Sequence, residues 1–135
     1  MEYFFINTDD LTTSDSSLSL GWFKIDEIII VNDSYCILTI SLCDLLEGVI
    51  SLKNDKIKNF KWILSDNGQI VFLERKKNSI VIKYKSYELR KGMDDLYQEI
   101  IDLGNQLINE LENNRKEVYE EAAFIDLKRV INQLS

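Results

Sequence analysis

Residues 56–87, KIKNFKWILSDNGQIVFLERKKNSIVIKYKSY, decide the fold, because they read as three consecutive antiparallel strands. Asn67-Gly68 lies between two apolar runs and favours a type I′ turn, since both central residues of that turn need positive φ. A two-residue loop at this point pairs Asp66 with Gln69, and the same register places Trp62 opposite Leu73. A third strand, over residues 80–87, returns alongside the second.

This register gives the predicted sheet one apolar face and one mixed face, because successive side chains of a strand point to opposite sides. The apolar face collects Phe60, Trp62, Leu64, Val71, Leu73, Ile80, Ile82 and Tyr84. The mixed face collects Lys61, Ile63, Phe72, Glu74, Val81, Lys83, Lys85 and Tyr87. We expect the aromatic side chains to pack in the core rather than to form a stacking platform for nucleic-acid bases.

The chain before this stretch contains further strand signals. Residues 2–7 are aromatic and β-branched, which is typical of a strand, and residues 8–20 are small and polar, which is typical of a loop. Two strands are predicted over residues 21–31 and 34–40. The continuous apolar run at residues 28–31 indicates burial on both faces, and therefore a central strand.

Three helices are predicted from apolar residues at helical spacing. The first covers residues 42–53, with Ser41 as N-cap and Asp44 completing a capping box. Gly48 inside it costs about 1 kcal/mol relative to alanine, which indicates close packing against a neighbour. The second begins at Met93 and carries an apolar stripe to Leu111, and the third covers roughly residues 116–134. The last two helices form either a hairpin packed on the sheet or a projecting arm.

These elements predict an α+β fold in a single domain over residues 1–135. The predicted architecture is an antiparallel β-sheet of about five to six strands, with one inserted helix and two C-terminal helices. The C-terminal helical part covers about residues 92–135.

The composition argues against most enzyme classes. The chain has no histidine, which removes the usual nucleophile activation and the commonest zinc sites. Its five glycines show no phosphate-binding spacing, and its two cysteines read as buried thiols. Adjacent acidic pairs diverge on a strand or a helix, so they build neither an acid–base pair nor a metal cage. We therefore expect no catalytic residues, no metal and no cofactor. A deep pocket with two converging carboxylates would revive an enzymatic function.

Charge is segregated along the chain, whose net charge is −7. Residues 1–52 hold nine acids and one base, residues 53–91 hold four acids and eleven bases, and residues 92–135 hold ten acids and four bases. The blocks either keep the surface soluble or form a surface potential that attracts a basic partner. Because acidic blocks repel phosphate, we expect no nucleic-acid binding. No apolar run reaches the ~20 residues that span a bilayer, so we expect a cytoplasmic protein.

An acidic docking surface is the candidate site. Its members come from the polar loop, the acidic pair before residue 28 and the last helix: Asp9, Asp10, Asp15, Asp26, Glu27, Glu117, Glu120 and Glu121. The alternative interpretation is that these residues are solvated charge without a partner.

The layout resembles that of the small immunity proteins of bacterial polymorphic-toxin and contact-dependent growth inhibition systems. The resemblance lies in the opening MEYFFI, the GWFKI–IIIVND strand pair, the LCDLLEGVI helix and the KNFKWILSDNGQIVFLE hairpin. It implies a cytoplasmic protein that tightly binds one cognate toxin domain, such as a basic nuclease domain, and blocks its active site or a needed surface. Such families share no functional positions, so the resemblance assigns no residue a role.

Two other functions stay open on the sequence alone. The first is an inhibitor of a nucleic-acid enzyme that mimics the charge of DNA, which needs carboxylates in regular rows. The second is a helical dimerisation or adaptor module that pairs through the stripe from Met93 to Leu111. The oligomeric state stays open as well.

Overall fold

The computed structural model describes residues 1–5, 20–30, 35–64, 68–114 and 122–134. Eight strands and three helices follow one another in these ranges: β1 (Glu2–Phe5), β2 (Leu20–Ile25), β3 (Ile28–Ile30), β4 (Cys36–Ile37), α1 (Leu38–Lys53), β5 (Asn59–Ile63), β6 (Ile70–Lys76), β7 (Ser79–Tyr84), β8 (Tyr87–Gly92), α2 (Met93–Asn114) and α3 (Ala122–Leu134). The predicted α+β class is confirmed. The strands form two four-stranded antiparallel sheets instead of one larger sheet.

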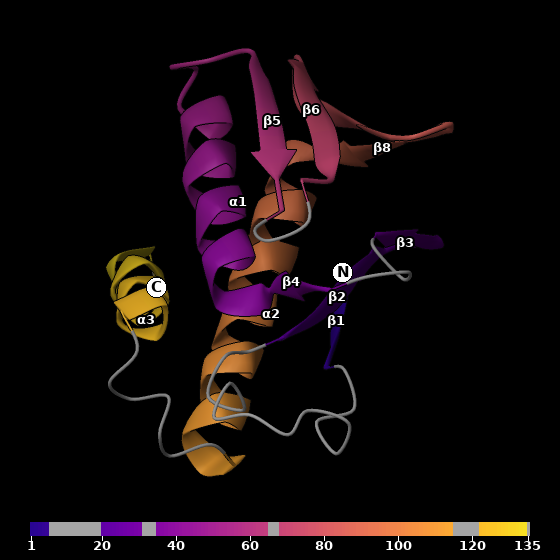
Figure 1. Cartoon of the computed structure of the whole chain (residues 1–135). Coiled ribbons are helices and arrows are strands. Elements are labelled where there is room, and N and C mark those ends of the chain that lie inside the picture. The colour runs from indigo at the N-terminus through magenta and orange to yellow at the C-terminus, as the bar shows by residue number, and fades with distance from the viewer. Residues whose placement is uncertain (6–19, 31–34, 65–67, 115–121, 135) are drawn as a thin grey trace.

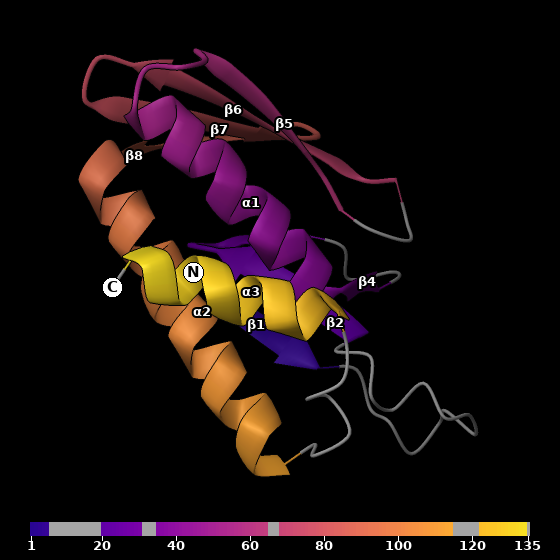
Figure 2. The same ribbon diagram turned by 90° about the vertical axis from the view of Figure 1, so that its left-hand side faces the viewer.

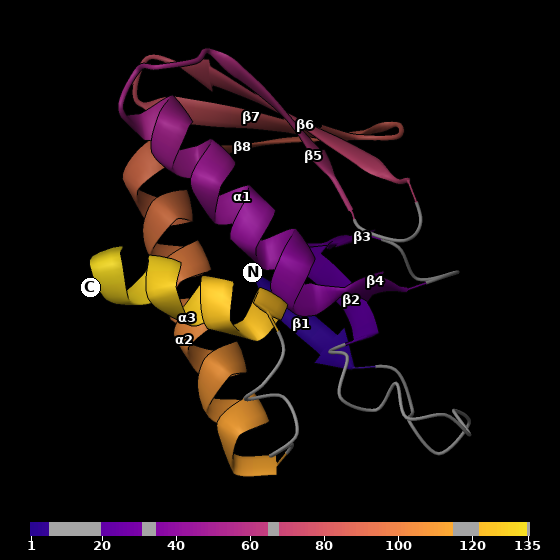
Figure 3. The same cartoon turned by 60° about the vertical axis from the view of Figure 1, so that its left-hand side comes forward.

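The two sheets lie along one side of the helices (Figure 1). Sheet A contains β1 to β4 and packs near the beginning of α1, whereas sheet B contains β5 to β8 and covers the end of α1 (Figures 2 and 3). The helix α3 lies on the opposite side of α1 and α2. One apolar core contains residues from both sheets and all three helices. Among the described helices, none is both long and apolar enough to cross a membrane.

Sheet A has β2 at its centre, with β1 on one side and both β3 and β4 on the other. The prediction of a central strand at residues 28–31 is therefore wrong. Within the described part of the chain, β3 pairs with β2 alone, and its middle residue, Ile29, is 45% exposed. The run is apolar in sequence, but only Ile28 and Ile30 enter the core. Ile29 faces solvent at the sheet edge.

Sheet B is a meander in which β5, β6, β7 and β8 pair in chain order. The predicted pairing of β5 with β6 is wrong by two residues, because Trp62 lies opposite Val71 instead of Leu73. The backbone N–H of Leu64 donates to the carbonyl of Gln69, so Leu64 pairs with Gln69 instead of Val71 and the predicted two-residue turn is wrong. Since strand side chains alternate with a period of two, this shift leaves each residue on its predicted face.

A fourth strand of sheet B was not predicted. The third strand ends at Tyr84, and Lys85 has a φ of 54°, which turns the chain back into β8. Tyr87 therefore begins a new strand and lies opposite Tyr84. Charged residues fill much of β8, and they hid its strand character in the sequence.

The helix α1 begins four residues before its predicted start. Its N-cap is Ile37, which makes no side-chain capping hydrogen bond, and Ser41 lies buried inside the helix. The predicted capping box is therefore wrong. Burial of Leu38 together with the later leucines stabilises the first turn, since packing contributes more to a helix than its cap. Gly48 packs against the ring of Phe60 so closely that a Cβ would overlap it, which confirms the predicted close contact.

The two C-terminal helices pack on α1 instead of projecting from the fold, and α3 crosses α2 rather than lying antiparallel beside it as in a helical hairpin (Figures 2 and 3). The whole predicted stripe of α2, from Met93 to Leu111, is buried in the core of the same chain. A helical dimer through this stripe would require the chain to open. In α3, Phe124 is buried and Ile125 is 51% exposed. The predicted start of this helix lies outside the described residues.

Candidate protein-binding site

The outer face of sheet B carries several exposed apolar side chains. The helices cover the inner face of this sheet, and no described helix or strand covers the outer one (Figures 2 and 3). Pairing brings side chains of all four strands into one row across this face, which contains Lys61, Phe72, Lys83 and Glu88. The row places apolar and charged groups next to one another on hydrogen-bonded strands.

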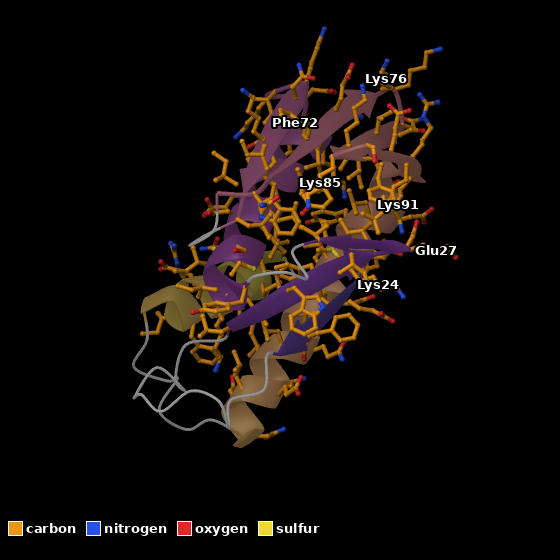
Figure 4. The ribbon with its side chains drawn as sticks, turned by 45° about the vertical axis from the view of Figure 1, so that its right-hand side comes forward. Lys24, Glu27, Phe72, Lys76, Lys85 and Lys91 are labelled. Atoms are coloured by element: carbon orange, nitrogen blue, oxygen red, sulfur yellow. The ribbon has the colours of Figure 1, made fainter. Side chains whose placement is uncertain are left out.

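Three exposed apolar side chains form a strip on β5 and β6. Ile63 lies opposite Ile70 and is 54% exposed, and Phe72, two residues further along β6, is 46% exposed. We call Ile63, Ile70 and Phe72 the apolar strip. Phe72 points away from the core on the outer face (Figure 4), so the prediction that it packs inside is wrong. Grouped exposed apolar residues on a monomer typically mark an interaction site.

Charged groups surround the apolar strip. The ammonium of Lys61 lies 5.9 Å from the centre of the Phe72 ring. Further across the sheet, Lys83 and Glu88 form an ion pair of 3.5 Å. Beside Phe72 is a hollow of about 550 Å³, in whose lining Val81 is buried and Lys83 is exposed. An apolar centre with a charged margin is the usual arrangement of a protein-binding surface.

Two of the eight acidic candidates lie in the described part of the chain, at the turn between β2 and β3. Asp26 has a φ of 53°, and its Oδ1 accepts a hydrogen bond of 2.9 Å from Lys91 Nζ. Lys91 Nζ also lies 2.7 Å from Glu99 Oε2. Burial acts to lower the pKa of Lys91, but its bonds to Glu99 and Asp26 outweigh that effect and raise the pKa. Asp26 thus serves an internal contact between the sheets.

Glu27 lines a hollow of about 420 Å³ where the two sheets meet, together with Ile29, Tyr84, Lys85, Ser86 and Tyr87. Figure 4 looks onto this side of the molecule and labels Glu27 and Lys85. Tyr87 is exposed, although the sequence predicted it in the core. The other six candidates, Asp9, Asp10, Asp15, Glu117, Glu120 and Glu121, lie outside the described residues.

Most of the ion pairs join acids and bases that neighbour each other on the surface. Eight described acids pair with bases in this way: Asp26, Asp55, Glu74, Glu88, Asp94, Glu99, Glu112 and Asp126. A mimic of DNA presents rows of unpaired carboxylates, so this interleaving disfavours that function over the described surface.

Two features of the described residues bear on reactive chemistry: the grouping of metal-ligating side chains and the state of the Cys43 thiol. Within the described ranges, no group of three or more His, Cys, Asp or Glu side chains is placed to hold a metal ion. Burial raises the pKa of the Cys43 thiol to about 11, with further contributions from Glu47 and Asp44. Because the thiolate is the reactive form, this thiol is a poor nucleophile at neutral pH.

The exposed apolar strip could be only partly predicted from the sequence. Strand alternation placed Ile63 and Phe72 on the mixed face, but Phe72 was assigned to the core because it is aromatic. The signal that identifies the strip is the alternation of Lys61, Ile63 and Phe72 with residues that do enter the core. Comparison of the chain with protein-family models, with curated proteins and with solved structures finds no match.

Proposed function

We propose that this chain is a non-enzymatic binding protein, an immunity protein that neutralises a cognate bacterial toxin domain in the cytoplasm by tight protein–protein binding. The observation that carries the proposal is the apolar strip on the uncovered face of sheet B. The side chains of Ile63, Ile70 and Phe72 are exposed to solvent. Burial of such apolar surface against a partner provides most of the affinity of protein complexes.

The rigidity of the surface supports tight binding. Each residue of the strip belongs to a strand paired within sheet B, and the inner face of that sheet is fixed by buried residues such as Trp62 and Leu73. Side chains held in this way lose little freedom when a partner binds. A preorganised surface of this kind suits an inhibitor, which must recognise one partner and hold it.

Charge gives the surface its specificity. The margin of the strip carries Lys61, Lys83 and Glu88, so a matching partner places apolar groups at the centre and opposite charges around them. The net charge of −7 acts at longer range and speeds the encounter with a basic toxin domain. Contact through the apolar strip therefore contributes to the affinity of the complex, and the net charge contributes to the rate at which the complex forms.

The test is complex formation with the product of the neighbouring gene, measured by co-purification, by calorimetry and by survival of cells that co-express both proteins. We expect a complex and protection from the toxin. Absence of both for the unaltered chain would refute the proposal.

A variant pair then locates the surface. Replacing Ile63 with lysine should weaken the complex by a factor of about 30 to 1,000, which is the usual effect at a central interface residue. Ile125→Lys is the matched control, because Ile125 is equally exposed but lies on α3, far from sheet B. Equal binding by the two variants would exclude the apolar strip as the contact surface.

A further inference from the structure

We propose that the open edge of β5, with the groove between β5 and α1, binds an extended segment of the partner that alternates basic and apolar side chains. The segment adds to sheet B as a further strand. The inference rests on the proposed binding function, and it specifies the chemistry of the partner.

Among the described residues, the backbone of β5 has one edge that no strand pairs with. The N–H of Leu64 bonds to the carbonyl of Gln69, and the carbonyl of Lys58 accepts from the N–H of Arg75. In an antiparallel pair every second residue makes such bonds, so residues 58, 60, 62 and 64 face β6. The N–H and C=O groups of Asn59, Lys61 and Ile63 therefore point away from the sheet. Within the described ranges, β6 is the one strand that pairs with β5.

A groove of about 340 Å³ runs beside this edge. One wall of the groove is α1, whose lining residues are spaced three or four apart and so lie on one side of the helix. The other wall consists of β5 and of Ile57, which precedes that strand. The lining residues are Asp44, Glu47, Gly48 and Ser51 on α1, with Ile57, Phe60, Lys61 and Ile63. Gly48 matters here because its missing side chain lets the Phe60 ring lie against the helix, which brings β5 close to α1.

The helix wall of the groove is acidic. Asp44 and Glu47 are exposed there, and neither forms an ion pair within the described part of the chain. Partial desolvation raises the pKa of Asp44, which agrees with its position against the groove. Lysine or arginine side chains from a partner would therefore find two carboxylates without a basic partner on this wall.

An added strand meets different surroundings on its two faces. Alternate side chains of such a strand would point toward α1, where Asp44 and Glu47 favour basic groups. The side chains between them would point outward beside Ile63 and extend the apolar strip. This geometry predicts a strand in which basic and apolar residues alternate.

A second copy of the chain meets this requirement poorly through either edge of its own sheet B. If it offers β5, the inner side chains of that strand, Phe60 and Trp62, already pack in their own core. If it offers β8, the inner side chain of Leu89 packs on its own core and Lys91 is already paired with Asp26 and Glu99. Neither strand therefore has free basic side chains on its inner face to supply to Asp44 and Glu47. A partner protein is therefore the better occupant than a homodimer.

The test uses ten-residue peptides that alternate lysine with valine, with glutamate–valine peptides of the same pattern as controls. Binding is followed by backbone amide shifts in NMR spectra of the full chain. We expect the lysine–valine peptide to shift the amides of residues 59, 61 and 63, and the glutamate–valine peptide to leave them in place. Shifts confined to other residues, or no shifts, would overturn the inference.

Two variants sharpen this test. Lys61→Pro removes an edge N–H that β6 does not use, so proline should be tolerated while the added strand is blocked. Lys61→Ala is its matched control, because it removes the same side chain and keeps the N–H. We expect at least tenfold weaker peptide binding for Lys61→Pro than for Lys61→Ala. Glu47→Lys leaves the backbone intact and should weaken binding by a similar factor.

The outcomes separate this inference from the proposed function. If Lys61→Pro and Glu47→Lys bind the peptide as the unaltered chain does, the edge is not the site. The toxin complex can still form through the apolar strip in that case. A chain that dimerises in ultracentrifugation and becomes monomeric with Lys61→Pro would show that a second copy occupies the edge, which also overturns the inference.

Discussion

Replacing Lys91 with methionine removes the cation that joins the two sheets to α2. Lys91 is in β8 of sheet B, and its ammonium contacts Asp26 in sheet A and Glu99 in α2. Methionine keeps most of the apolar length of the side chain, so the change isolates the charge. We expect the variant to fold and to be less stable.

The magnitude follows from the exposure of the three side chains. The Lys91 side chain is 11% exposed, Glu99 is 36% exposed and Asp26 is 52% exposed. Exposed pairs contribute about 0.2–1 kcal/mol, whereas breaking a fully buried pair costs about 3–5 kcal/mol. This partly buried arrangement lies between those limits, so the expected loss is about 1–3 kcal/mol.

Urea denaturation followed by tryptophan fluorescence measures this loss. A fall of 2 kcal/mol shifts the midpoint by about 1 M for a typical urea dependence. Lys83→Met is the matched control, because Lys83 is in the same sheet and pairs with Glu88 at 3.5 Å while both are largely exposed. The control should lose less than about 1 kcal/mol. Equal losses of unfolding free energy for the two variants would refute the conclusion that the ion pairs of Lys91 stabilise the contact between the two sheets and α2.

The pH dependence provides a second check. The pKa of Lys91 is raised in the folded chain above its ordinary 10.5, so its contribution is complete below pH 10.5 and is lost as the pH rises through the folded value. The stability difference between the unaltered chain and Lys91→Met should therefore shrink above pH 10.5. A difference that stays constant there would contradict the proposed protonation effect.

Three more predictions concern the core. Trp62→Phe should lower the free energy of unfolding by about 2 kcal/mol in a denaturant titration, because it leaves space and removes the 2.7 Å bond from Nε1 to the Ser41 carbonyl; an unchanged midpoint would contradict this. Gly21→Ala should cost about 3 kcal/mol in a thermal melt, because its Cβ would overlap the carbonyl of Phe4. Cys43, whose pKa is raised to about 11, should resist iodoacetamide at pH 8 until urea is added; mass spectrometry that finds it labelled in the native chain would argue against its burial.

Much of the local structure could be predicted from the sequence because it depends on short-range alternation. The faces of β5 and β6 are as predicted even though their register differs, since a shift of two residues preserves which side each residue faces. The stripe of α2 is also as predicted. The Asn67-Gly68 pair led to a wrong register, because it indicates a type of turn without indicating how many residues connect the two strands.

Other features depend on packing between distant segments, which no local pattern contains. Ser41 has the chemistry of a helix cap, but burial of the first turn of α1 moves the helix start to Leu38. Ile29 belongs to an apolar run, but the run ends at a sheet edge. Phe72 is aromatic, yet it faces solvent because its strand has helices on the other side only. In each case the tertiary environment outweighs the residue type.

The charge blocks have a role that composition alone did not suggest. The basic block, residues 53–91, pairs with the acidic blocks on both sides of it within one chain. Lys91 contacts Asp26 in the block before it and Glu99 in the block after it. Segregated charge therefore helps to assemble the fold, in addition to any attraction of a partner.

The order of the strands in sheet B has a consequence for how the protein forms. Each strand pairs with its immediate neighbour in the chain, so sheet B needs only short loops to close. We expect this sheet to assemble early in folding, and the first strands of the chain to be fixed only after α2 is available to cover the core. Pulsed hydrogen exchange should then protect the amides of β6 and β7 before those of β2. The surface proposed to recognise the partner would be among the first parts of the molecule to exist.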